Sequence, residues 1–193
     1  MNNIIEKIYR FDHFVLYFIQ EHIRCEVLTP IMNISSTLVN IGFIWVISCL
    51  IMLCFKKTRM IGIITLSSLA LCLLVNNVCI KHIVARARPF DTYSDLYPLI
   101  KKPTDYSFAS GHTTASFAAA GILARFIPRS LAIVSVVFAV TVAFSRLYLG
   151  VHYPTDVICG IMLGLSGSIL TYYIYSKKFD LDNYKIRKLS VKQ

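Results

Sequence analysis

Charged residues are scarce in this sequence. Asp, Glu, Lys and Arg make up 16% of its 193 residues, hydrophobic residues make up 56%, and the mean hydropathy is +0.62. A soluble domain usually carries about 25% charged residues, which help to cover its surface in water. The scarcity argues against an ordinary soluble domain, and it excludes intrinsic disorder for the same reason. We therefore expect an integral membrane protein with short loops.

Acidic residues are the rarer of the two charge classes. Lys and Arg number 20 against 10 Asp and Glu, so the net charge is +10. Because the basic residues lie between apolar segments, we expect anionic lipid or a phosphorylated ligand as partner, and no nucleic acid. The six cysteines lack the spacing of a zinc site or a disulfide framework, and we expect buried small apolar residues there.

Five stretches contain no charged residue, and they locate the expected membrane spans. A membrane-spanning helix needs roughly 20 apolar residues. The stretches are Leu28–Phe55, Met60–Ile80, Tyr106–Ala124, Ser130–Ser145 (which we extend through Arg146 to Leu149) and Val157–Ser176. No repeat or low-complexity linker divides the chain. The sequence predicts an all-α membrane helical bundle of about five transmembrane helices in a single domain, 1–193.

The first 26 residues have a different pattern. Apolar residues and one histidine recur there at helical spacing, with charged residues between them: Ile4, Ile8, Phe11, Val15, Phe18 and His22. The pattern predicts an amphipathic helix lying at the membrane interface. An ordinary helix packed on the bundle stays open as an alternative. A signal peptide is disfavoured because the apolar run is short and no small-residue cleavage site follows.

The distribution of basic residues predicts the orientation. Five spans place eleven Lys and Arg on one side, six of them in the tail 177–193, and nine on the other. Three of the nine, Lys81, Arg88 and Arg146, are candidate ligand-binding residues, which leaves six. Because cytoplasmic loops carry the excess of Lys and Arg, we expect a basic cytoplasmic tail and an outward-facing loop 88–106.

Two cations mark the end of the second span. Lys81 and Arg88 are seven residues apart, close to two helical turns, so a continuous helix would present both on one face. Pro89 is expected to end that helix. Considered alone, the pair is equally compatible with cations that extend to the membrane interface.

A possible anion site lies at the start of the third span. Ser110 and Gly111 are favourable helix N-cap residues, and the free backbone N–H groups at such an end bind anions. Gly111 would let an anion approach the backbone closely. His112 follows directly. A capped helix start beside an interfacial histidine is the structural alternative.

A histidine and a carboxylate follow the fourth span. His152 and Asp156 are four residues apart, so in one helix they would share a face, and Pro154 between them suits the first turn of the next helix. A carboxylate that accepts from one imidazole nitrogen leaves the other nitrogen as nucleophile or base. Arg146 precedes them.

These clusters lie at span ends on the same predicted membrane face. Ionisable groups near membrane depth are costly, so such a set indicates a functional site. The cations and the helix start favour a phosphate, and two histidines favour in-line displacement by one and protonation of the leaving oxygen by the other. A two-metal mechanism is disfavoured because the outward loop offers only Asp91, Asp95 and Asp105.

The motifs resemble those of the type 2 phosphatidic acid phosphatase family, whose superfamily includes bacterial undecaprenyl pyrophosphate phosphatases and vanadium haloperoxidases. The family pattern is K-x6-R-P, P-S-G-H and S-R-x5-H-x3-D. The first corresponds to Lys81 through Arg88-Pro89, and the third to Ser145-Arg146 through Asp156. The second carries Ala109 in place of the usual proline, which removes a rigid residue but no functional group. The motifs cover residues 81–156.

The resemblance implies a role for each matching residue. His152 would be the nucleophile that forms a phosphohistidine, Asp156 would orient it, and His112 would protonate the leaving oxygen. The phosphate oxygens would be held by Lys81, Arg88, Ser110, Gly111 and Arg146. This scheme requires no metal or cofactor.

The expected function is that of a membrane lipid phosphatase at the outer face, of the undecaprenyl pyrophosphate type, with a substrate that enters from the bilayer. Phosphatidate or phosphatidylglycerophosphate is the alternative substrate, because the motifs bind only the shared phosphate. Vanadate-dependent halide oxidation is disfavoured by the apolar spans. An anion transporter is the non-enzymatic alternative, disfavoured because ionisable residues avoid the span centres. The oligomeric state stays open.

Overall fold

The computed structural model describes residues 3–186, and every regular element in that range is helical. The α-helices are α1 (Asn3–Phe18), α2 (Leu28–Thr37), α3 (Phe43–Cys54), α4 (Arg59–Leu74), α5 (Lys81–Val84), α6 (Pro89–Thr92), α7 (Gly111–Phe126), α8 (Arg129–Tyr148) and α9 (Pro154–Ser176). Two π-helical turns, η1 (Ile19–Ile23) and η3 (Val75–Ile80), and two 3-10 turns, η2 (Asn40–Gly42) and η4 (Leu181–Tyr184), complete the set. The predicted all-α class is confirmed.

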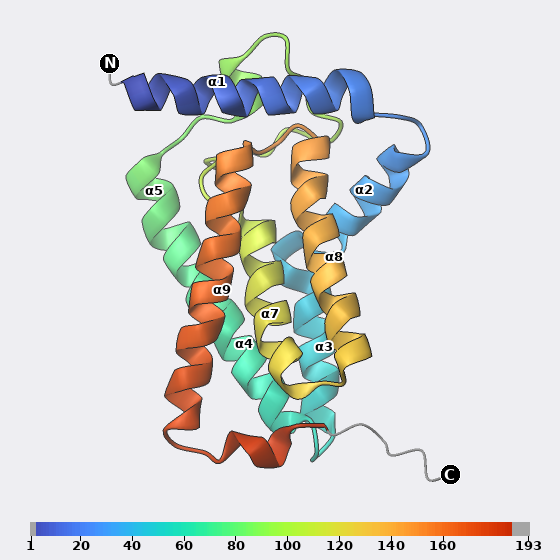
Figure 1. Ribbon diagram of the computed structural model, residues 1–193, viewed down its shortest axis with the longest axis vertical. Helices are drawn as coiled ribbons and strands as arrows, with labels where there is room; N and C mark the ends of the chain where they lie inside the picture. The colour runs from blue at the N-terminus through green and yellow to red at the C-terminus, as the bar shows by residue number, and fades with distance from the viewer. Residues whose placement is uncertain (1–2, 187–193) are drawn as a thin grey trace.

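Helix α7 lies at the centre of the bundle and packs against α4, α8 and α9 (Figure 1). Small residues make this close packing possible, as is common between membrane helices. Ala118 to Ala120 of α7 are buried, and Gly164 of α9 faces the same helix. A Cβ atom added at Gly164 would lie 2.6 Å from the backbone oxygen of Thr114, so only glycine fits at this crossing.

Three stretches in the described range are long and apolar enough to cross a membrane: Arg59–Thr92, Arg129–Tyr148 and Pro154–Ser176. Helices α3 and α7 run beside them in the bundle but have only 12 and 16 residues (Figure 1). The prediction of one helix over the first apolar stretch is wrong. That stretch is divided into α2 and α3 at Gly42, whose φ of 73° lies in the left-handed region that glycine adopts readily.

Helix α1 lies across one end of the bundle (Figure 1). Ile4, Ile8 and Phe11, from the expected apolar face, are exposed, whereas the buried residues are Asp12 and Leu16. The helix therefore contacts the protein through a different face from the one that the apolar pattern marks. Its apolar face is left open, and an interfacial role for residues 1–26 stays a prediction.

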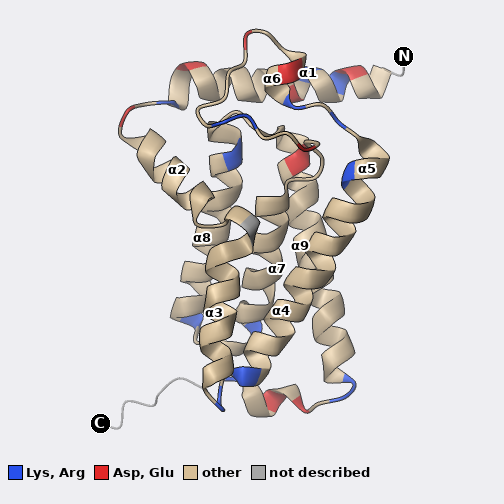
Figure 2. Cartoon of the chain, turned by 180° about the vertical axis from the view of Figure 1, so that it is seen from behind, with Lys and Arg blue, Asp and Glu red and all other residues tan. Residues whose placement is uncertain are grey.

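Charged residues gather toward the two ends of the bundle, and its middle is almost free of them (Figure 2). The described part of the predicted tail, residues 177–186, follows α9 at the end of the bundle opposite α1 (Figure 1), whereas Arg187, Lys188 and Lys192 lie outside the described residues. The cysteines are unpaired. The prediction that they are buried holds for Cys49 and Cys72 and is wrong for the three exposed ones, Cys25, Cys54 and Cys79.

Candidate active site

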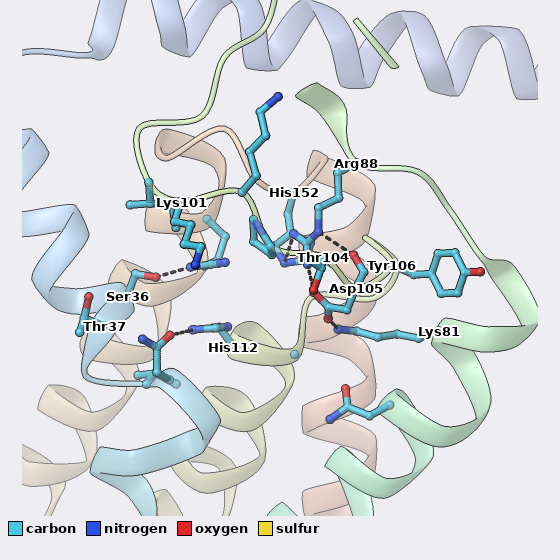
Figure 3. A pocket seen from close by; sticks show the side chains of 18 of the residues that line it. Ser36, Thr37, Lys81, Arg88, Lys101, Thr104, Asp105, Tyr106, His112 and His152 are labelled. Carbon is cyan, nitrogen blue, oxygen red and sulfur yellow. Dashed lines mark hydrogen bonds and ion pairs between the residues drawn. The ribbon is translucent and has the colours of Figure 1, made fainter. Parts of the chain in front are cut away.

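A cavity of about 980 Å³ opens beneath α1, at the end of the bundle where α5, α7 and α8 meet the loops 93–110 and 149–153 (Figure 3). Six of the eight predicted site residues line it: Lys81, Arg88, Gly111, His112, Arg146 and His152. The other two, Ser110 and Asp156, are fully buried and do not form its wall. Both imidazoles therefore face one space, although 40 residues separate them in the chain.

His152 lies at the start of α9 and not inside it. Tyr153 is the N-cap residue, Pro154 is the first helical residue, and Asp156 accepts the backbone N–H of Tyr153 at 3.0 Å. Asp156 Oδ2 is 3.5 Å from His152 Nδ1, an ion-pair distance longer than a hydrogen bond. The other ring nitrogen, Nε2, lies 3.4 Å from Arg88 Nη1. The ring thus has one nitrogen toward the carboxylate and one toward the cations.

Burial makes the protonated form of His152 unfavourable. The residue is 2% exposed, and burial, opposed in part by Asp156, lowers the pKa of its imidazole to about 4. The ring is consequently neutral at pH 7, with a lone pair on one nitrogen. A neutral imidazole beside a buried carboxylate has the protonation state that a nucleophile requires.

This shift gives a pH prediction. Protonation would block attack by Nε2, so we expect kcat/KM of the free enzyme to have an acid limb near the His152 pKa of about 4. Below that pH, kcat/KM falls about tenfold per pH unit. The measurement is phosphate release against pH, with the substrate's own ionisation followed by ³¹P NMR. An enzyme-derived limb near the ordinary histidine pKa of about 6.5 would contradict the assignment.

His112 lies in the first turn of α7, and Ser110 is the N-cap residue, as predicted. The Nε2 atom of His112 lies 2.9 Å from the amide oxygen of Asn40 in η2. Asn40 was not identified from the sequence. A Cβ atom at Gly111 would make only ordinary contacts of 3.7 Å or more with neighbouring side chains, so the fold itself does not demand glycine there.

The prediction that Lys81 and Arg88 share one helical face is wrong. Helix α5 ends at Val84 because Ala85 takes up a left-handed conformation with φ of 44°. Arg88 is extended, as residues before proline prefer, and Pro89 begins α6 instead of ending a helix. The two cations are brought together through a shared anionic partner.

That partner is Asp105, which the sequence offered only as a loop residue. Its carboxylate pairs with Lys81 Nζ and, at 2.7 Å, with Arg88 Nη2, and its backbone oxygen accepts Arg88 Nε–H at 2.9 Å (Figure 3). Although burial raises the pKa of Asp105, the two cations lower it to about 2. Lys81 and Arg88 therefore already bind one oxyanion, the Asp105 carboxylate. An incoming phosphate must displace this carboxylate or share its cations.

Arg146, at the end of α8, is a third cationic side chain in the cavity wall, beside Lys81 and Arg88. It is 3% exposed and its Nη1 donates to Ser36 Oγ of α2. Its Nε–H has no acceptor among the described side chains and backbone. Ser36, like Asn40, belongs to the stretch expected to be a plain membrane span. The site therefore has a second wall that no motif marks.

The comparisons with known proteins agree with this arrangement. The model of the PAP2 superfamily matches residues 61–180. An undecaprenyl-diphosphatase of Sulfolobus acidocaldarius is 38% identical over 134 residues, which cover 69% of this chain and 65% of that protein. A lipid A 4'-phosphatase of Bacteroides thetaiotaomicron is 33% identical over 107 residues, 52% of this chain and 48% of that protein. The matches thus span about half to two thirds of these relatives.

A solved structure supports the fold along most of the chain. The crystal structure of a transmembrane PAP2 type phosphatidylglycerolphosphate phosphatase from Bacillus subtilis superposes with a TM-score of 0.74 at 28% identity. The superposition covers 91% of this chain and 88% of that one.

Proposed function

The chain belongs to the PAP2 superfamily, and from this premise we propose that it is a membrane lipid phosphatase that works through a phosphohistidine on His152. The observation that carries the proposal is the convergence of two imidazoles and three cationic side chains on one cavity. The polar lining of the cavity lies at one end of an apolar bundle, where a lipid headgroup can reach it while the lipid tail stays in the bilayer.

The mechanism follows from what each side chain can do. Nε2 of His152 attacks phosphorus, the P–N bond forms, and the bond to the leaving oxygen breaks. His112 donates a proton to that oxygen; burial and the nearby cations lower its pKa in the free protein, so the bound phosphate must raise that pKa for His112 to act as the acid. Water then attacks the phosphorus atom, with His112 accepting its proton; the P–N bond breaks, inorganic phosphate leaves, and His152 is neutral again. Lys81, Arg88 and Arg146 stabilise the charge on the transferring group throughout.

We propose a polyprenyl diphosphate as substrate. The Sulfolobus relative is named for undecaprenyl diphosphate, and the cavity is large enough for two phosphates. Two further cations, Lys101 and Lys102, also line it. They come from the loop before α7, outside the motifs that contain the phosphoryl-transfer residues, so they are candidates for holding the second phosphate. Phosphatidate, phosphatidylglycerophosphate and lipid A phosphates share the same reacting group and stay as alternatives.

The test is phosphate release from undecaprenyl diphosphate, phosphatidate and phosphatidylglycerophosphate by the purified protein in EDTA. We expect the highest kcat/KM with the diphosphate. Release that depends on added magnesium would contradict the metal-independent scheme. No release from any of the lipids would contradict the proposed function itself.

The adjacent lysines allow a specificity prediction. Replacing both Lys101 and Lys102 with alanine is expected to raise KM for undecaprenyl diphosphate roughly tenfold, the equivalent of about 1.4 kcal/mol, and to change KM for phosphatidate little. The matched control replaces Lys177 and Lys178, an exposed pair at the other end of the bundle. An equal rise in KM for both substrates would mean that the two lysines do not bind the second phosphate.

We also propose that the cavity faces outward and the C-terminal tail faces the cytoplasm. The excess of basic residues at the tail end supports this orientation. A protease-cleavable tag after residue 193 tests it in right-side-out vesicles. Protection of the tag supports the proposed orientation, and cleavage from outside contradicts it.

A further inference from the structure

A network of buried charges lies behind the active site, on the side away from the cavity. Its outermost member is Asp12 of α1, a carboxylate with no solvent exposure. Burying a charged carboxylate is costly unless it is paired and hydrogen-bonded. Asp12 Oδ2 lies 2.6 Å from Arg86 Nη2, and Asp12 also accepts the backbone N–H of Thr155 at 3.0 Å and its hydroxyl at 2.6 Å.

Arg86 connects Asp12 to the candidate active site. Its second terminal nitrogen, Nη1, donates to Asp156 Oδ1 at 2.8 Å and to Thr155 Oγ1 at 2.7 Å. The guanidinium lies 3.7 Å from the centre of the Tyr153 ring, which it contacts through its face. Only a planar, forked donor can bridge two carboxylates in this way, and the shorter point charge of lysine cannot.

The network fixes the rotation of the Asp156 carboxylate. Oδ2 accepts from Ser107 Oγ at 2.5 Å and from the Tyr153 backbone, and it is the oxygen that faces His152 Nδ1. Arg86 is the one recorded hydrogen-bond partner of the other oxygen, Oδ1, within residues 3–186. Losing this contact would leave the carboxylate held through Oδ2 alone, with less restraint on its rotation against the imidazole.

We propose that Asp12 and Arg86 are positioning residues: the carboxylate from the N-terminal helix holds Arg86, and Arg86 holds Asp156 against the nucleophile. Helix α1 thereby belongs to the catalytic apparatus although it contributes nothing to the cavity wall. The inference rests on the proposed function, because its effect is exerted through His152. In the phosphohistidine the imidazole ring carries positive charge, and the net negative charge of two carboxylates and one guanidinium stabilises it.

The structure supplies a matched control for this idea. Helix α1 is also held by His13, whose Nε2 lies 2.8 Å from Asp95 in the loop after α6. This pair docks the same helix, and within residues 3–186 neither partner forms a hydrogen bond or ion pair with Asp156 or Arg86. If Asp12 merely docks α1, then Asp12→Asn, like Asp95→Asn, should leave kcat of the folded protein near the wild-type value, although the loss of the buried carboxylate lowers stability more. If Asp12 positions the site, only the former should affect turnover.

The experiment measures kcat and KM of the full-length protein for undecaprenyl diphosphate in detergent micelles, together with thermal melting. Asp12→Asn is expected to lower kcat by about 10- to 100-fold, the usual range for residues that orient a functional group, and to change KM less than about twofold. Asp95→Asn is expected to stay within about twofold of wild type in kcat and KM, because it touches no residue of the site. Arg86→Lys should lower kcat as Asp12→Asn does.

Thr155→Val is the second variant, needed if Asp12→Asn does not fold. It removes the hydroxyl between Asp12 and Arg86 at nearly constant volume, and kcat should fall about fivefold or more with KM unchanged. Unchanged kcat in the folded variants, or equal losses in Asp12→Asn and Asp95→Asn, would overturn the proposal. If the wild-type protein releases phosphate and His152→Ala does not, either of these results refutes the positioning role and leaves the proposed function standing. Inert wild-type protein would refute the proposed function and this inference together.

Discussion

Replacing His152 with alanine abolishes phosphate release, with an expected loss in kcat of at least about 10⁴-fold. The reason is that no other nucleophile in the described cavity wall is both neutral and backed by a buried carboxylate. Removing the ring removes the covalent path, and the cations can then only bind the substrate. The measurement is kcat for undecaprenyl diphosphate, with binding of the substrate followed separately.

The control for this variant is His22→Ala. His22 is an exposed histidine in η1, near the same end of the bundle, and its nearest recorded contact is the backbone oxygen of Phe18. Its loss should leave kcat unchanged. If His152→Ala retained a tenth or more of wild-type turnover, the nucleophile would have to be another group.

Replacing His112 with alanine gives the second large effect, and its size depends on the leaving group. General acid catalysis is typically worth about 10²–10⁴ in rate. Phosphatidate expels an alkoxide, which needs the proton, so the full loss is expected there. An aryl phosphate such as p-nitrophenyl phosphate expels a stable anion, and the loss should be below about tenfold.

A polyprenyl diphosphate should behave like the aryl phosphate, because its leaving group is a phosphate monoester, whose second pKa is only about 6. The measurement is kcat of His112→Ala relative to wild type for the three substrates. A matched variant, Asn40→Ala, removes the amide that contacts His112 while leaving the acid in place, and it should show a smaller loss with the same order of substrates. Losses that are equal for all three would contradict the role of general acid.

Local signals in the sequence predicted the helix starts well. Ser110 occupies the N-cap position of α7, although its side chain accepts no capping hydrogen bond there, and Pro154 is the first residue of α9, where its fixed φ suits the first helical turn. The motifs also identified six residues that line one cavity. Local chemistry was misleading where the chain departs from a residue's own preference, as at Ala85, an L-residue in the left-handed region.

The partners that the sequence missed come from distant segments. Ser36, Asn40 and Asp105 contact Arg146, His112 and the two cations across 110, 72 and 17 to 24 residues of chain. No spacing rule connects such pairs. The sequence did not reveal Asp12 for another reason. The apolar pattern of α1 marks the exposed face of that helix, whereas the carboxylate of Asp12 lies on the buried face. A buried carboxylate becomes conspicuous only once the helix is seen to pack through it.

The most direct test of the central claim is a rapid-quench experiment with undecaprenyl diphosphate carrying ³²P in its terminal phosphate. The account predicts a transient protein-bound label that is stable in base, labile in acid and located on the peptide containing His152, and that is absent from His152→Ala. Phosphate release by active protein with no label at His152, or with the label on another residue, would contradict it.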